Sequence, residues 1–201
     1  TFMVGGWEAG RMFPLHIVSH VHGMILHGFL ISSNAKRELI PGIATKWELS
    51  QDGKTWTVTI RDGVKFHDGR PLSAEDVYFT WLQGYGPGAR EKSTSSSNQS
   101  QAANTLKIEL LDPKRVSITT KIVDSGFPYY ISDITGSVQG VVLPRWELDK
   151  IHDDEKLQAY DRNPIAAGIM KMVRHVPFEV MQFERFDDYY NPDTRVKFKS
   201  L

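Results

Sequence analysis

The stretch of residues 54–85 constrains the fold more than any other, because a strict apolar alternation there runs almost directly into an amphipathic helix pattern. Within Thr55–Ile60, apolar residues alternate with threonines, which is the period of a strand buried on one face. After Asp62-Gly63 the alternation resumes at Val64 and Phe66, so the spacing predicts a β-hairpin.

A helix is predicted next. Ser73 followed by Glu75 and Asp76 is typical of a capped helix start, since a carboxylate in the first turn can accept a bond from the cap residue. From residue 74 to Tyr85, apolar residues recur at i, i+3 and i+4. The glycines and proline of 84–88 then end the helix.

The rest of the chain alternates short strands and helices, which predicts an α/β fold with a mixed β-sheet and packed helices. Residues 106–110 and 116–120 read as a second hairpin across a turn at 112–114, and the polar stretch 93–101 reads as a loop. Further elements are expected as follows: a strand at 2–4 with a helix after residue 21, helices at 127–135 and 144–160, and strands at 169–173, 179–185 and 195–198.

Composition excludes several function classes. Lys+Arg and Asp+Glu both total 24, so no net field draws the chain to nucleic acid. Cysteine is absent, which removes disulfides and thiolate chemistry. The apolar run Met24–Ile31 is too short to span a bilayer, and no signal-peptide pattern opens the sequence.

Enzyme signatures are missing from the sequence as well. It holds no Gly-x-Ser-x-Gly elbow, no phosphate loop and no His-Glu-x-x-His motif. The pairs Asp153-Asp154 and Asp187-Asp188 are adjacent, so their carboxylates point in different directions. A hydrolase whose carboxylates are brought together by the fold, and a scaffold or interaction domain, remain open as alternatives.

Two long motifs carry a resemblance. Residues 41–77 read PGIATKWELSQDGKTWTVTIRDGVKFHDGRPLSAEDV, and residues 163–190 follow with Asn-Pro-Ile-Ala-Ala-Gly and end in Asp-Asp-Tyr-Tyr. The chain resembles the family-five extracellular solute-binding proteins, the peptide and nickel receptors of ABC importers. The resemblance implies a periplasmic-binding-protein-like lobe whose second lobe is absent. Residues 1–201 are then a first-lobe fragment: about 1–40 the inner sheet and first helix, about 41–160 an outer subdomain, and about 161–201 the return to the inner sheet.

The resemblance also implies a function. The protein is expected to capture a peptide or a related polar ligand and to deliver it to an ABC-importer permease, without catalysis and without a cofactor. The location is periplasmic or extracellular, with a lipid anchor on the full-length protein as an option. The fragment is expected to self-associate through its open face.

The motif residues themselves read mostly as scaffold, because their glycines, proline and aromatics serve turns and core. The ligand-binding candidates lie elsewhere: Trp7 and Glu8 in the loop after the first strand, and, by family position, Ser19, His20 and Tyr85. Glu8 could pair with a ligand amine, or it could be a surface carboxylate beside a core indole.

Two further features bear on the ligand. His16, His20 and His27 would share a face of one helix, but no neighbouring carboxylate completes a ligand set, so no metal site is predicted. The family usually has Gly-Thr-Gly-Pro-Tyr where this chain reads Ala-Ala-Gly-Ile-Met at 166–170, which leaves open whether the ligand is a peptide, a nickel chelate, an oligosaccharide or an opine.

Overall fold

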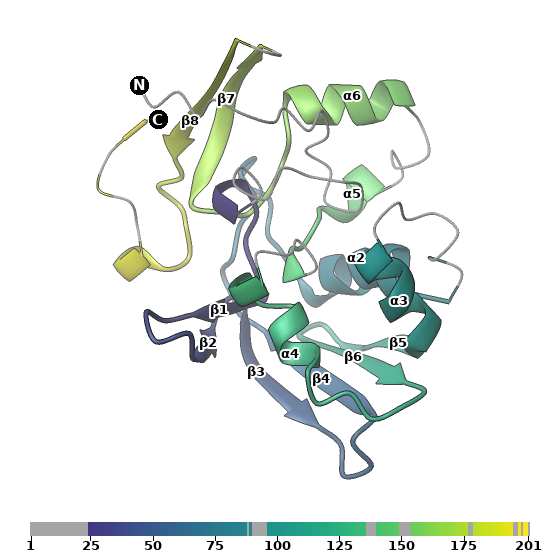
Figure 1. Cartoon of the computed structure of the whole chain (residues 1–201). Coiled ribbons are helices and arrows are strands. Elements are labelled where there is room, and N and C mark those ends of the chain that lie inside the picture. Colours follow the sequence, from purple (N-terminus) through teal and green to yellow (C-terminus); the bar gives the residue numbers. More distant parts are fainter. Residues whose placement is uncertain are drawn as a thin grey trace.

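The computed structural model describes residues 24–87, 89, 96–135, 140–148, 154–176, 179–194, 197 and 199–200 (Figure 1). In chain order the elements are β1 (Ile31–Ser33), β2 (Leu39–Pro41), β3 (Ala44–Leu49), β4 (Thr55–Ile60), α2 (Ala74–Tyr85), α3 (Ser96–Asn104), β5 (Thr105–Asp112), β6 (Arg115–Thr120), α4 (Phe127–Tyr130), η2 (Asp133–Thr135), α5 (Arg145–Leu148), α6 (Asp154–Arg162), β7 (Met170–Val176), β8 (Val180–Arg185) and η4 (Pro192–Thr194).

A four-stranded antiparallel sheet of order β3-β4-β6-β5 forms the centre of the fold. The apolar residues of β4 are buried and its threonines are half-buried, which confirms the strand expected from their alternation. The antiparallel pair β5–β6 confirms the second predicted hairpin. Two smaller antiparallel pairs, β1–β2 and β7–β8, flank the central sheet (Figure 1).

The prediction of a hairpin between residues 55–60 and 64–66 is wrong. β3 and β6 occupy both edges of β4, so no edge remains for residues 64–66. Gly63 takes a φ of 76° at the turn, and Lys65 forms an isolated bridge with Pro71. The segment is instead a loop that leads the chain from the sheet into α2.

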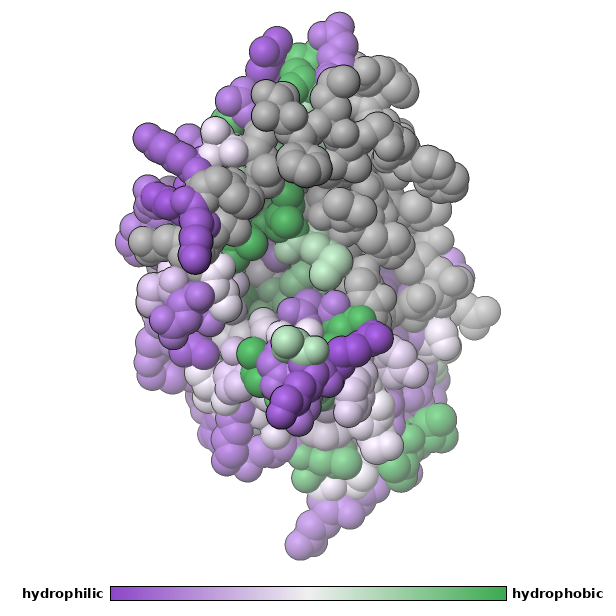
Figure 2. Space-filling view, turned by 60° about the vertical axis from the view of Figure 1, so that its left-hand side comes forward, coloured by the Kyte–Doolittle hydropathy of each residue, from purple (hydrophilic) through white to green (hydrophobic). Residues whose placement is uncertain are grey.

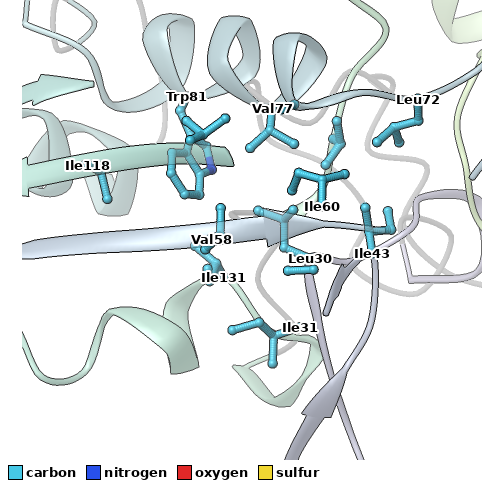
Figure 3. Packing of buried hydrophobic residues seen from close by; sticks show 14 of the residues in the cluster. Leu30, Ile31, Ile43, Val58, Ile60, Leu72, Val77, Trp81, Ile118 and Ile131 are labelled. Carbon is cyan, nitrogen blue, oxygen red and sulfur yellow. The ribbon is translucent and has the colours of Figure 1, made fainter. Parts of the chain in front are cut away.

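α2 confirms the predicted helix and its capping box. Its inner face meets the sheet: Val77 and Trp81 lie close to Ile60 and Ile118 in one buried cluster (Figure 3). The Trp81 ring also packs edge-on against Phe127 of α4, with centroids 5.6 Å apart. Burial of one such side chain contributes roughly 1.5–3 kcal/mol, which makes α2 the main partner of the sheet.

Three other predictions need correction. The stretch 93–101, expected as a loop, is helical from Ser96 as part of α3. In place of one helix at 127–135 the chain forms the short α4 and η2, and in place of one at 144–160 it forms α5 and α6. The strands expected at 169–173 and 179–185 are confirmed as β7 and β8. The strand predicted at 2–4 lies outside the described residues, as does most of 195–198. Of the helix expected after residue 21, the described part is helical at residues 24–26.

Asp76 joins α2 to the segment that leads into α5. One oxygen of its fully buried carboxylate accepts bonds from the Ser73 N–H, at 2.9 Å, and the Ser73 hydroxyl, at 3.0 Å. The other accepts the Arg145 N–H at 3.2 Å and the Arg145 guanidinium at 3.3 Å. A single carboxylate thus caps the starts of both helices. The charge pairing itself is weak, because the Arg145 side chain is 42% exposed.

We expect Asp76→Ala to lower the free energy of unfolding by roughly 2–4 kcal/mol, because it leaves buried N–H and O–H donors without an acceptor. Ser73→Ala should cost less, about 0.5–2 kcal/mol, since it removes one of these bonds. Urea unfolding measures both. The control is Glu75→Ala one residue away, whose exposed side chain should contribute less than about 0.5 kcal/mol. Equal losses for Glu75→Ala and Asp76→Ala would contradict the double-cap role.

Candidate functional site

Four of the five residues that the sequence singled out as ligand contacts, Trp7, Glu8, Ser19 and His20, lie outside the described residues. The fifth, Tyr85, ends α2 and is 3% exposed within the main core cluster. Burial raises the pKa of its phenol far above the usual value, so the hydroxyl stays protonated. Its contact with a ligand stays a prediction.

Metal and carboxylate sites find no support in the described part of the chain. His27 is buried, and the described residues hold no group of three His, Cys, Asp or Glu side chains placed to bind a metal. Asp187 pairs with Arg185 at 2.7 Å and Asp188 with Lys65 at 2.8 Å. The adjacent carboxylates therefore serve two different cations and form no acid/base dyad.

The two sequence motifs meet at His67. Its backbone N–H donates to the Ala166 carbonyl at 2.8 Å, and its ring Nε2 lies 3.1 Å from the Gly168 carbonyl oxygen. Because a carbonyl only accepts, Nε2 carries the proton and Nδ1 is the bare nitrogen. The ring packs edge-on against Phe186, with centroids 5.0 Å apart. The loop before α2 is thereby fixed to the segment that enters β7.

Burial lowers the pKa of His67 to about 4, with the nearby Lys171 adding to the effect and the Gly168 bond and Asp68 opposing it. Protonation would place a new N–H on Nδ1, which is buried and has no hydrogen-bond partner among the described residues. The imidazole is therefore neutral near pH 7 and acts as a structural donor.

A pocket of about 200 Å³ opens beside this junction, and we call it the tyrosine pocket. It lies between the β1–β2 hairpin and the segment that follows β8. Its described lining consists of Met24, His27, Phe29, Ser32, Ser33, Ile40, Pro41, Asp133, Ile169, Tyr189, Tyr190, Asn191 and Thr194. Figure 2 looks onto this side of the molecule, where hydrophobic residues line a hollow behind the hydrophilic tip of the hairpin.

The two tyrosines form one wall of the tyrosine pocket. The rings of Tyr189 and Tyr190 are tilted against each other with centroids 4.5 Å apart, and the Arg61 guanidinium lies 5.3 Å from the centre of the Tyr190 ring. Burial raises the pKa of both phenols, so they are neutral across the physiological range. In the sequence, this pair of tyrosines was noted only as the end of the second motif. Two adjacent tyrosines after a strand could have indicated an aromatic binding surface.

Asp133 is the charged residue in the described lining of the tyrosine pocket, and the sequence did not single it out. It sits in η2, far from Tyr189 in sequence, and its Oδ1 is buried with no hydrogen-bond partner among the described residues. Only the fold brings it to the tyrosines. A carboxylate, two neutral phenols and apolar side chains in one small hollow make a site for a small molecule, with no group arranged for covalent chemistry among the described lining.

Comparison with known proteins shows the family to which the chain belongs. Residues 38–201 match the family model described as bacterial extracellular solute-binding proteins, family 5 middle, so the chain belongs to this family of binding proteins rather than to a family of enzymes. The chain is 31% identical to the oligopeptide-binding protein OppA of Bacillus subtilis over 178 residues, which is 84% of this chain and 31% of that protein. Against the dipeptide-binding protein of Escherichia coli it is 25% identical over 179 residues, 79% of this chain and 31% of that protein.

Solved structures agree on the fold. NikZ of Campylobacter jejuni in complex with Ni(L-His) matches with a TM-score of 0.77 and 25% identity, over 96% of this chain and 36% of that one. DppA of Helicobacter pylori with the peptide STSA matches with a TM-score of 0.76 and 21% identity, over 94% of this chain and 39% of that one. The α/β, periplasmic-binding-protein-like fold is thus confirmed. The chain spans about a third of the length of the curated relatives it matches.

In the described part of the chain, no helix is both long and apolar enough to cross a membrane.

Acid should weaken this fold through His67. Its folded pKa of about 4 lies below the ordinary unfolded value, so the unfolded chain binds the proton first. Neutral His67 contributes fully to the free energy of unfolding above about pH 6.5. This contribution is lost as the pH falls toward 4, by roughly 3 kcal/mol in total. Urea unfolding across this range should show a smaller decline for His67→Gln, which keeps an N–H donor but cannot titrate. If the free energy of unfolding falls equally with pH in the unmodified chain and in His67→Gln, then His67 does not cause the loss of stability in acid.

Proposed function

We propose that this chain is the first lobe of a receptor that captures a small extracytoplasmic solute, a peptide or a related polar ligand, and hands it to an ABC importer. The family match over residues 38–201 is the observation that carries the proposal. The peptide is favoured because the relatives that match over most of this chain include dipeptide-, di/tripeptide- and oligopeptide-binding proteins.

The internal organisation supports a lobe that moves as one body. The sheet with α2 corresponds to the outer subdomain proposed for about residues 41–160, and β7–β8 to the return proposed for about 161–201. His67 joins these parts, because its backbone N–H donates to the Ala166 carbonyl and its ring to the Gly168 carbonyl. Closure of a receptor around its ligand requires such rigid bodies, with the motion confined to a hinge between lobes.

Location and partners follow from the proposed class. The receptor works in the periplasm or outside the cell, free or held by a lipid anchor, and its partner is the importer permease. Self-association of this chain alone through its open face stays a proposal, and β5 offers a further surface for pairing. This strand is at the edge of the sheet and exposes Leu106, Leu110 and Leu111, and such edges favour pairing with another copy.

The predicted contact of Trp7 and Glu8 with the ligand can be tested in the full-length receptor. Replacing Trp7 and Glu8 together by alanine should weaken binding of the cognate peptide by tenfold or more, roughly the effect of losing a charge-assisted bond, with little change in melting temperature. Isothermal calorimetry reads the affinity. Unaltered affinity would remove this loop from the ligand site.

The one-lobe proposal predicts a difference between this chain and the full-length receptor. A ligand held from two sides loses half of its contacts and its shelter from water when one lobe is missing. We therefore expect the 201-residue chain to bind the peptide at least a hundredfold more weakly, roughly 2.7 kcal/mol. Side-by-side titrations measure this difference, and light scattering on the chain alone measures its self-association. Equal affinities would place the whole site within this chain and overturn the proposal.

A further inference from the structure

We propose that the tyrosine pocket is a second binding site, selective for a small organic cation: a primary ammonium carried on a short apolar chain. The inference goes beyond the proposed import function, because it concerns a hollow formed within this chain rather than a cleft between lobes. The argument rests on the size of the pocket, on its unpaired carboxylate and on its aromatic wall.

Size limits the ligand first. A volume of about 200 Å³ corresponds to about seven waters at their share of the liquid, and it lies below the range of pockets for drug-sized molecules. The part of a ligand that lies inside the pocket is therefore of about amino-acid size. The apolar side chains of Met24, Phe29, Ile40 and Ile169 line part of the same space, so a short hydrocarbon portion would be buried there.

The charge of the pocket lining determines which polar group a ligand should carry. Asp133 is the one charged residue in the described lining, and its buried Oδ1 has no donor among the described residues. A buried acceptor without a partner is costly, and a carboxylate more so than a neutral group. Arg61 does not supply the missing donor: its Nε bonds the Gly42 carbonyl at 3.1 Å and it does not line the pocket. Asp133 is only partly buried and lines the pocket, so a ligand ammonium can approach the exposed side of its carboxylate.

The tyrosines favour the same ligand. Their π-faces attract a cation, and their hydroxyls can accept a bond from an ammonium as well as donate one. Because burial raises the pKa of both phenols, neither becomes an anion that would change this selectivity near neutral pH. An anionic ligand, by contrast, would meet Asp133 with no compensating Lys or Arg in the described lining.

The experiment compares n-butylammonium with n-butanol, which has the same carbon chain and no charge. Both are titrated into the 201-residue chain carrying isotope-labelled tyrosine, and ring shifts are followed by NMR. We expect ammonium to bind at least tenfold more tightly than the alcohol and to shift the Tyr189 and Tyr190 signals, which Tyr→Phe variants assign. Asp133→Asn should abolish the preference for ammonium and leave the weak alcohol binding unchanged.

The matched control is Asp193→Asn, which removes the same charge from exposed η4 beside the pocket and should leave the preference intact. Equal loss in both variants would mean general attraction by surface charge and would overturn the proposal. So would equal binding of the two probes, or no tyrosine shift with either. If Asp133→Asn does not fold, Tyr189→Leu provides the second test, since loss of the aromatic wall must weaken the ammonium more than the alcohol. Peptide titrations of the intact receptor report on the interlobe site, so either result can fail without the other.

Discussion

The backbone of residues 166–168 is the constraint on which the other parts of the fold depend, because it is held from two sides at once. The Gly168 N–H donates to the Leu26 carbonyl at 2.9 Å, while its own carbonyl oxygen faces the His67 ring. The approach is so close that a Cβ on Gly168 would lie 2.5 Å from the Leu26 carbonyl oxygen, and one on Gly28 would lie 2.6 Å from the Ala167 carbonyl oxygen. Two glycines therefore allow two chain segments, 25–28 and 167–168, to touch backbone to backbone. The His67 backbone N–H joins a third segment by its bond to the Ala166 carbonyl.

This junction also sets the position of the tyrosine pocket. Ile169 follows Gly168 directly, and its carbonyl accepts the Phe186 N–H at 3.0 Å, which fixes the chain three residues before Tyr189. On the other side, Lys65 and Arg61 of the loop before α2 contact Asp188 and the Tyr190 ring. The pocket wall is thus held by the contacts that join the two motifs, and a change at the junction would be felt in the pocket.

Periodicity predicted the elements that bury one regular face, and failed where the reason for an element lies elsewhere in the chain. α2 and β6 bury such a face and were predicted correctly. β5 was also predicted as a strand, although Leu106 and Leu110 of its alternating pattern are exposed. β3 was missed because it lies at the sheet edge and buries little beyond Ala44, and the false hairpin at 64–66 followed from not seeing that β3 occupies that edge. α3 has a polar sequence, yet Asn98 and Ala102 are buried in the fold, so its helical state depends on tertiary contacts. For the same reason Asp133, remote in sequence, could not be placed in a pocket beforehand.

Two polar residues of the first family motif have structural roles and do not identify a ligand. His67 and Asp76 are polar, sit in the first motif and could pass for functional groups, yet each is buried and spends its hydrogen bonds on the backbone of this chain. Such bonds specify one arrangement of loops and helices, and burial keeps both side chains away from a solute. We infer that specificity depends on side chains other than these two, and Tyr189 and Tyr190 of the second motif are among the candidates. This explains how one fold accommodates a peptide in one solved relative and a nickel–histidine complex in another. Under the two proposals above, ligand specificity depends on the side chains that line the cleft and the tyrosine pocket, where a single substitution can change the chemistry without disturbing the junction of the two motifs.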